Sequence, residues 1–337
     1  MAGNQLAAFA AKMQGKFGEE RIPSQETKRD VLTTTSLTLD WALRLGGIEM
    51  GAIYEIVGEK DSFKTSLAIG MLGEAQRRWP DRGVAYIDLE KTYREDWARR
   101  LGLLNTFAAT QAGYWQHLFP VDSEDASDMA RQYAGSGLYS LIVIDSVGGM
   151  ESRKAFNKEA GDDIVGKNAQ VITRMAKHLA TLTWQNQCAI ILINQYRANL
   201  SGYGGALSAG PLALQYATTG KIEMKPIGGA DGTRMAKFGD SEEPVSKQVR
   251  ARVTRLKNAT PGRRAEFWFN IQPTETYGPV GINVADEYAT MGIRYGVIAR
   301  EGKGSYYVVP GADKVNGQPA VRKLLLDRPE LLEAVRK

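Results

Sequence analysis

The chain alternates short apolar runs, rich in β-branched residues, with stretches that have the spacing of amphipathic helices. Between residues 37 and 269, four apolar runs predict strands: Ile53 to Val57, Val84 to Asp88, Leu141 to Asp145 and Ala189 to Asn194. Strands that alternate with helices form a parallel sheet covered by helices. The pattern therefore predicts an α/β core whose ligands bind beyond the carboxyl ends of the strands.

The N-terminal segment has a helical pattern of its own, which we expect to end at Pro23. Its apolar positions are Leu6, Phe9, Ala10, Met13 and Phe17. An apolar face on a terminal arm can pack on the core of its own chain, or it can dock onto a neighbouring subunit. The sequence pattern leaves both alternatives open.

The C-terminal segment begins with several prolines and glycines after residue 271 and then changes pattern. It predicts a helix over residues 284–291, a hairpin over 300–309 and a final amphipathic stretch. We therefore expect an N-terminal helical arm (residues 1–33), an α/β core (34–270) and a small α+β C-terminal domain (271–337).

Composition and charge are those of an ordinary globular protein. The 337 residues exceed the usual size of a single core, and 43% of them are hydrophobic. A formal net charge of +5 permits a polyanionic partner without requiring one, because 43 basic residues are nearly matched by 38 acidic ones. The single cysteine, Cys188, excludes an intrachain disulfide. Since no apolar run reaches the length of a membrane span and no signal peptide is evident, we expect a cytoplasmic protein without a membrane partner.

A phosphate-binding loop is the most informative motif of the chain. It consists of Gly58, Glu59, Lys60, Asp61, Ser62, Phe63, Lys64, Thr65 and Ser66. It follows a predicted strand and precedes a predicted helix, as such loops do. We expect the backbone N–H groups to hold the phosphates of ATP, Lys64 to reach the β and γ oxygens, and Thr65 to bind Mg²⁺. Phe63 stands where glycine usually precedes the lysine, so its ring needs an apolar surface and its backbone must avoid conformations open only to glycine.

Acidic and amide residues end three further strands and complete the predicted nucleotide site. Asp145 can order the water shell of the Mg²⁺ that Thr65 binds. Glu90 lies two residues beyond Asp88 and can orient a water for attack on the γ-phosphate; the alternative is that both acids cap the next helix. Gln195 can contact the γ-phosphate through its amide and report the nucleotide state to the segment that follows.

Two glycine-containing segments are candidate partner-binding loops. Residues 199–211 include four glycines and few side chains that can pack, which predicts a loop that a partner orders. Residues 159–166 form a second polar loop, and the helix after it carries Lys167, Arg174 and Lys177. The alternative is that these segments are plain linkers.

Taken together, these motifs resemble those of the bacterial RecA recombinase family. The resemblance covers nearly the whole chain and rests on the order of the motifs: Leu39-Asp40 and Gly46-Gly47 before the phosphate loop, Tyr86 to Glu90, Leu141 to Ser146, Glu159 to Asp162, and Ile193 to Arg197. It implies a RecA-type P-loop ATPase core. Phe63 is similar to the phenylalanine found in recombinases of T-even bacteriophages, which suggests a phage-encoded protein.

The resemblance implies an ATP-dependent recombinase that acts in DNA recombination and repair. Proteins of this family form helical filaments on single-stranded DNA, bind ATP and Mg²⁺ at the subunit interface, and exchange strands with homologous duplex DNA. We therefore expect a DNA-dependent ATPase and a homo-oligomer, with a single-strand-binding or mediator protein as a further candidate partner. The expected location is the nucleoid, or the host cytoplasm for a phage protein.

The resemblance also assigns roles to matching residues. Glu90, Lys64 and Gln195 take the catalytic roles given above. Arg255 and Lys257 match two lysines that reach the γ-phosphate of the neighbouring subunit, and Trp97 matches an aromatic residue beside the adenine. DNA contacts are implied in two loops, at about residues 155–166 and 197–212. The DNA-binding residues are Val165, Gly166, Lys177, Arg197, Leu200 and Gly210.

Some features depart from the family pattern. Gln170 replaces an arginine, Pro211 replaces a glycine, and the segment of residues 228–247 is longer than its bacterial counterpart, without a functional account. Two other functions stay open: a RecA-fold helicase that forms closed rings, and a DNA-filament protein with weak ATPase. The arm and the glycine loops favour a recombinase over the helicase, and Glu90, Gln195 and Arg255 favour it over the weak ATPase.

Overall fold

The computed structural model describes residues 2–18, 29–105, 111–150, 164–197, 207–208, 211–302 and 305–336. The chain forms two compact units, residues 1–30 and residues 31–337. The first unit contains helix α1 (Ala2–Phe17), as its sequence pattern predicts, and Pro23 lies outside the described residues. The boundaries expected after residues 33 and 270 stay predictions.

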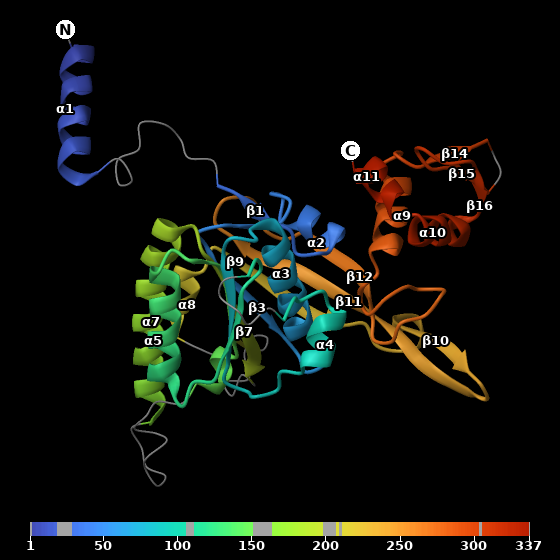
Figure 1. Cartoon of the computed structure of the whole chain (residues 1–337), viewed down its shortest axis with the longest axis horizontal. Helices are drawn as coiled ribbons and strands as arrows, with labels where there is room; N and C mark the ends of the chain where they lie inside the picture. The colour runs from blue at the N-terminus through green and yellow to red at the C-terminus, as the bar shows by residue number, and fades with distance from the viewer. Residues whose placement is uncertain are drawn as a thin grey trace. The chain divides into compact units, whose positions relative to one another are not determined.

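A large sheet forms the centre of the second unit (Figure 1). Its strands are β3 (Ile53–Gly58), β4 (Gly83–Asp88), β5 (Trp115–Leu118), β6 (Tyr139–Asp145), β7 (Ala189–Arg197), β9 (Gly220–Pro226), β11 (Ser241–Leu256), β12 (Arg264–Asn270) and β13 (Gly281–Ile282). They lie in the order β13-β12-β11-β9-β3-β7-β6-β4-β5. The pairs from β9 to β5 are parallel, and those from β9 to β13 are antiparallel. The four predicted strands are β3, β4, β6 and β7, so the predicted α/β core with a mainly parallel sheet is confirmed.

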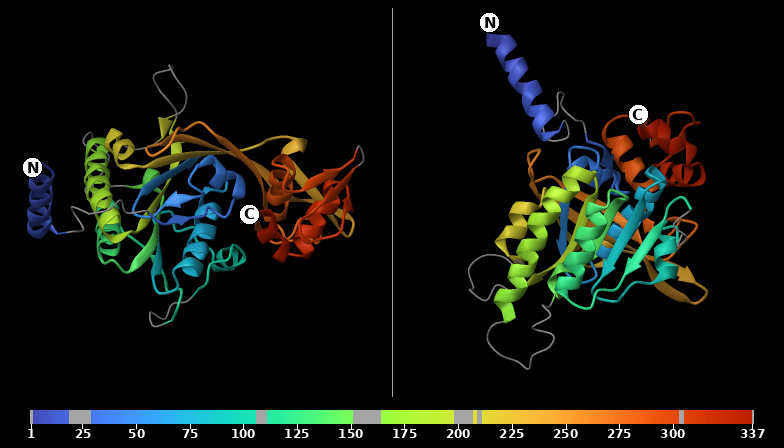
Figure 2. Two further views of the ribbon diagram at one scale, coloured as in Figure 1. Left: turned by 90° about the horizontal axis from the view of Figure 1, so that it is seen from above. Right: turned by 60° about the vertical axis from the view of Figure 1, so that its left-hand side comes forward.

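Helices cover both faces of the parallel part (Figure 2). Helices α3 (Lys64–Arg78) and α4 (Glu95–Arg100) lie on one face, and α5 (Ser123–Gly135) and α7 (Ile164–Asn186) lie on the other. Because successive side chains of a strand point to opposite faces, Tyr54 and Ile56 pack in the core beneath α3, whereas Ile53 packs in the core beneath α5 and α7. The short helix α8 (Leu212–Ala217) contacts α7.

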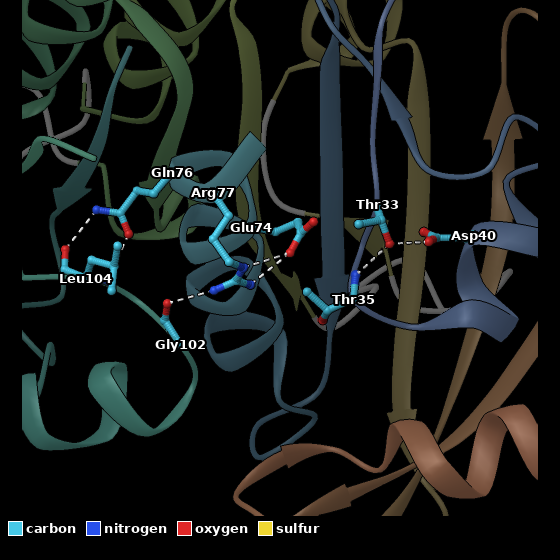
Figure 3. A network of polar contacts seen from close by, with 8 residues as sticks. All are labelled: Thr33, Thr35, Asp40, Glu74, Gln76, Arg77, Gly102 and Leu104. Atoms are coloured by element: carbon cyan, nitrogen blue, oxygen red, sulfur yellow. Dashed lines mark hydrogen bonds and ion pairs between the residues drawn. The ribbon is translucent and has the colours of Figure 1, made fainter. Parts of the chain in front are cut away.

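Polar contacts hold the C-terminal part of α3 in place (Figure 3). The buried amide of Gln76 donates to the carbonyl oxygens of Leu104 at 2.8 Å and Gly113 at 2.6 Å, and accepts from the Leu104 N–H at 2.8 Å. Arg77 donates to the carbonyl oxygen of Gly102 at 3.1 Å. These bonds fix the orientation of the helix whose first residue, Lys64, belongs to the phosphate loop.

The C-terminal part of the second unit has a small core of its own. It consists of α9 (Val284–Arg294), β14 (Ala299–Glu301), β15 (Tyr306–Val308), β16 (Val315–Asn316), α10 (Gln318–Asp327) and α11 (Glu330–Arg336). The strands form an antiparallel sheet, and Ala289, Val309 and Leu325 lie buried between sheet and helices. The expected small α+β fold is thereby confirmed.

A buried carboxylate joins this part to the beginning of the core. Strands β1 (Val31–Leu32) and β2 (Ile48–Glu49) pair there, and helix α2 (Leu37–Ala42) lies between them in the chain. Glu287 of α9 accepts hydrogen bonds from the Ser36 hydroxyl at 2.6 Å and from the N–H groups of Leu37 at 3.1 Å and Thr38 at 3.2 Å. Burial raises the pKa of Glu287 to about 7, although these hydrogen bonds act to lower it.

The long segment of residues 228–247 contains the short helix η2 (Ala230–Gly232) and a hairpin of β10 (Thr233–Phe238) with the first part of β11. Arg234 of this hairpin donates to Asp286 of α9 at 2.9 Å, and its guanidinium lies 3.9 Å from the centre of the Trp268 ring. This segment is thus anchored to the C-terminal part of the chain. Among the helices of the described residues, none is long and apolar enough to cross a bilayer.

Candidate nucleotide-binding site

The phosphate loop connects β3 to α3 at the carboxyl end of β3. Gly58 is required there, because a Cβ atom at this position would lie 2.2 Å from the carbonyl oxygen of Met224 on the neighbouring strand β9. Asp61 and Phe63 both have left-handed backbone conformations, with φ of 59° and 62°. The loop therefore curls tightly and ends at the N-terminus of α3, the end of a helix that attracts anions.

The Lys64 ammonium lies inside this loop. It donates hydrogen bonds to the carbonyl oxygen of Glu59 at 2.6 Å and to the hydroxyl of Ser62 at 3.2 Å. Burial lowers the pKa of Lys64, while the carboxylates of Asp145 and Glu90 act in the opposite direction. The loop thus holds a cation close to the backbone N–H groups that begin α3.

Asp145 and Thr65 meet, as their positions at the end of β6 and at the start of α3 led us to expect. The Thr65 hydroxyl donates to Oδ2 of Asp145 at 2.7 Å, and the buried Tyr86 hydroxyl donates to the same oxygen at 2.8 Å. Burial raises the pKa of Asp145 to about 6, against the effect of these two bonds. A hydroxyl and a carboxylate oxygen in contact are ligands suited to Mg²⁺ and its water shell.

Glu90 and Gln195 also meet, although β6 separates their strands in the sheet. The Gln195 amide donates to Oε1 of Glu90 at 2.9 Å, and both side chains are exposed. The alternative role of Asp88 and Glu90 as caps of α4 does not fit this geometry, since the N-cap residue of α4 is Arg94 and no side chain caps that helix. The structure therefore places the solvent-facing carboxylate of Glu90 in contact with β7, the strand that pairs with β3 before the phosphate loop.

Aromatic side chains line the other side of the loop. The Phe63 ring stacks on the ring of Phe269 of β12, with ring centres 4.4 Å apart. The ring centre of Trp97 of α4 lies 6.4 Å from that of Phe269. The Trp97 indole donates to the Ser66 hydroxyl at 3.1 Å. The expected apolar surface for Phe63 is thereby found. Its backbone lies in a region that glycine favours but that other residues can also enter.

A cavity of about 380 Å³ opens at the loop. Residues 61–66 form one wall, and Lys247 of β11 and Ile271 form the other. Neither Lys247 nor Ile271 was a candidate from the sequence, because their proximity depends on the order of the strands and no local motif marks them. A second cavity of about 520 Å³ lies between α2 and the C-terminal helices, and none of the predicted site residues lines it.

The remaining predicted residues lie outside the phosphate-loop cavity. Arg255 is half-buried near the end of β11, and Lys257 donates from its ammonium to the carbonyl oxygen of Tyr216 at 2.5 Å. Burial lowers the pKa of Lys257, and the charge of Arg255 acts in the same direction. The structure does not bring these two cations to the loop of their own chain, and their role towards a neighbouring subunit stays a prediction.

The predicted DNA-binding residues are only partly described. Helix α7 begins at Ile164, so Val165 and Gly166 lie in its first turn instead of in the expected loop. In the sequence, the apolar residues Ile164, Val171 and Met175 already have the spacing of one helical face. Lys177 is exposed on the same helix, and Arg197 is the last residue of β7. Leu200 and Gly210 lie outside the described residues.

The phosphate loop follows the central parallel strand β3, and Asp145 ends β6, two positions away from β3 in the sheet. This arrangement of fold and site defines a P-loop nucleotide-binding protein. Residues 5–272 match the family described as the RecA N-terminal domain. Since this match covers most of the sequence, the chain belongs to the RecA family of recombinases.

Bacterial RecA proteins are similar to the chain over nearly its whole length. Protein RecA of Chlorobaculum tepidum is 28% identical over an alignment 343 residues long, which covers 99% of the chain and 91% of the relative. Protein RecA of Streptomyces rimosus is 29% identical, over 98% of the chain and 83% of the relative. Protein RecA of Thermus thermophilus is 31% identical, over 95% of the chain and 86% of the relative. The phage origin suggested by Phe63 stays a prediction.

Proposed function

We propose that this RecA-family recombinase binds ATP and Mg²⁺ in the phosphate loop and hydrolyses ATP to ADP and phosphate when DNA is bound. It assembles as a helical filament on single-stranded DNA, pairs this strand with a homologous duplex and exchanges strands. The observation that carries the proposal is the contact of Gln195 with Glu90, beside the contact of Thr65 with Asp145. Together these contacts support phosphate binding, metal binding and water activation in one region.

The residues of the loop fit Mg·ATP. The N–H groups at the start of α3 and the Lys64 ammonium can bind the β and γ phosphates, and Trp97 offers a ring beside the base. Thr65 can bind the metal directly, and Asp145 can hold its water shell. A bound Mg²⁺ neutralises charge that develops on the phosphates during hydrolysis. Lys247, across the cavity, adds a second positive charge.

Glu90 is the candidate for orienting the attacking water. Its carboxylate is exposed and accepts a hydrogen bond from the Gln195 amide, which can exchange hydrogen-bond partners. When Gln195 turns its amide towards a γ-phosphate, it releases Glu90 to the water. Gln195 lies in β7, the strand that leads into the second predicted DNA loop, so it can link nucleotide and DNA binding.

The proposed assembly accounts for the two cations that lie away from their own loop. Arg255 and Lys257 are close enough for their charges to interact, and in a filament they can reach the nucleotide of the neighbouring subunit. On the DNA side, Lys177 is exposed on α7 and Arg197 ends β7. Contacts of basic side chains with phosphates do not depend on base sequence, which a search for homology requires.

The test compares the wild type with Glu90→Gln for Mg·ATP binding, ATP hydrolysis with and without single-stranded DNA, and filament formation by electron microscopy. Glu90→Gln should bind Mg·ATP and DNA and form filaments, while hydrolysis falls roughly 10²-fold or more. Glu95→Gln removes an exposed acid of α4 that pairs with Arg99, and should hydrolyse ATP at the wild-type rate.

Three results would contradict the proposal in different ways. A wild-type protein that ignores DNA at saturating Mg·ATP would exclude the recombinase function. Filaments of wild-type protein without ATP turnover would select the DNA-filament protein with weak ATPase. Full hydrolysis by Glu90→Gln would leave the function standing and remove Glu90 from its role.

A further inference from the structure

Asp88, the last residue of β4, is fully buried and closes the turn that carries Glu90. Its Oδ1 accepts from the N–H of Lys91 at 2.6 Å, and its Oδ2 accepts from the N–H of Tyr93 at 3.3 Å. Nε2 of His117 lies 3.1 Å from the same Oδ2. Three donors from two segments of the chain thus converge on one carboxylate.

The turn depends on these bonds, because its backbone is constrained on both sides of Glu90. The N–H groups of Leu89 and Glu90 point to the carbonyl oxygen of Asp145, at 2.7 and 3.3 Å. The next residue, Lys91, has a left-handed conformation with φ of 55°, which costs a side-chain-bearing residue energy. The Asp88 carboxylate holds the N–H of this strained residue and so fixes the backbone immediately after Glu90.

His117 enters from the neighbouring strand β5, where it pairs in register with Tyr86. Its ring is 13% exposed and lies among aromatic rings, with centres 4.5 Å from Tyr93, 4.0 Å from Phe119 and 5.6 Å from Tyr86. The imidazole can hardly swing away from Asp88 in this packing. Burial acts to raise the pKa of Asp88, but the bonds from His117, Tyr93 and Lys91 outweigh it and lower the pKa.

We infer that His117 is a positioning residue for ATP hydrolysis, which acts through Asp88 to hold the turn that carries Glu90. The inference rests on the proposed role of Glu90. Loss of the donor leaves a buried carboxylate with one partner fewer, and the turn can then relax. A shift of about 1 Å in a catalytic group is enough to lower a rate by roughly 10²-fold, so the effect should fall on kcat.

The test uses full-length protein and DNA-dependent ATP hydrolysis. His117→Leu removes the donor and should lower kcat about 10- to 100-fold with KM for ATP changed less than about threefold. His117→Gln can place an amide N–H near the position of Nε2 and should recover most of kcat. Gln116→Leu changes the adjacent residue of β5, whose amide oxygen accepts from Tyr114 and Tyr139, and should keep the wild-type kcat.

A double variant shows whether His117 acts through Glu90. In the Glu90→Gln background, His117→Leu should cause little further loss, because the group that it positions is already absent. An equal further loss would overturn the inference, as would wild-type kcat for His117→Leu. Should His117→Leu fail to fold, Asp88→Asn takes its place, with the same loss of kcat expected and wild-type kcat overturning the inference. Wild-type hydrolysis by Glu90→Gln alone would remove Glu90 from its proposed role, and the inference with it, while leaving the recombinase function standing.

Discussion

The ring of Phe63 stacks on the ring of Phe269, with centres 4.4 Å apart and planes inclined by 20°. The residue that replaces a glycine in the phosphate loop therefore packs against the core with a partly buried ring, although its backbone lies at φ 62°. That conformation costs roughly 1–2 kcal/mol. A stacked aromatic pair contributes about 0.5–1.5 kcal/mol beyond the burial of its area. Stacking and burial together thus offset the strain.

Substitutions at Phe63 separate the ring from the backbone. Phe63→Ala loses the ring and keeps the strain, whereas Phe63→Gly loses the ring and relieves the strain. We expect the free energy of unfolding to fall in the order wild type, Phe63→Gly, Phe63→Ala, with the two variants about 1 kcal/mol apart. Urea unfolding measures this order, and ATP hydrolysis should not rise in Phe63→Gly. A large gain of ATP hydrolysis in Phe63→Gly would show that the ring lowers the activity of the wild type.

Lys247 should strengthen the binding of nucleotide phosphates, because it lines the cavity opposite the start of α3. Lys247→Ala should weaken Mg·ATP binding about tenfold, the loss of roughly 1.4 kcal/mol, and should leave adenosine binding unchanged. Calorimetric titration of both ligands at two salt concentrations measures the effect. Lys237→Ala removes an exposed lysine from the neighbouring strand β10 and serves as the control. Equal Mg·ATP affinity in Lys247→Ala and wild type would exclude the contact.

Glu287 should make the stability of the second unit depend on pH. Burial raises its pKa from 4.5 to about 7, so between these values the folded protein keeps a proton that the unfolded chain has lost. The free energy of unfolding should therefore decrease as pH rises through this window, by up to about 3 kcal/mol from this group. The contribution is fully present below pH 4.5 and is lost above pH 7.

Urea unfolding at several pH values checks this expectation. Glu287→Gln cannot ionise, so the difference in stability between wild type and variant should change across the window. Glu333→Gln, at a side chain of α11 that is 73% exposed, should follow the wild type at every pH. A constant difference between wild type and Glu287→Gln would show that the buried group stays in one protonation state.

The sequence predicted the parts of the molecule that local pattern determines. Strands β3, β4, β6 and β7 are apolar runs bounded by polar residues, and the loop before Lys64 has a motif that spans few positions. Chain order alone also placed Thr65 near Asp145, because the carboxyl ends of parallel strands share one edge of a sheet.

Contacts that depend on strand order lay beyond such reasoning. Phe269 and Lys247 reach the loop from β12 and β11 because those strands run antiparallel beyond β9, a topology that no motif announces. Likewise, His117 meets Asp88 because β5 pairs with β4, and a lone histidine in a sequence shows no partner. The start of α7 at Ile164 was missed because glycine at position 166 suggested a loop.

Strand β7 does not end its pairing at Gln195. Tyr196 and Arg197 pair antiparallel with Ser208 and Leu207 of β8 (Leu207–Ser208), directly after the amide that contacts Glu90. The residues that precede and follow the intervening segment therefore pair with each other in one short antiparallel ladder. In the proposed function, a movement of the Gln195 amide displaces Tyr196 and Arg197 and, through this ladder, Leu207 and Ser208 together with them.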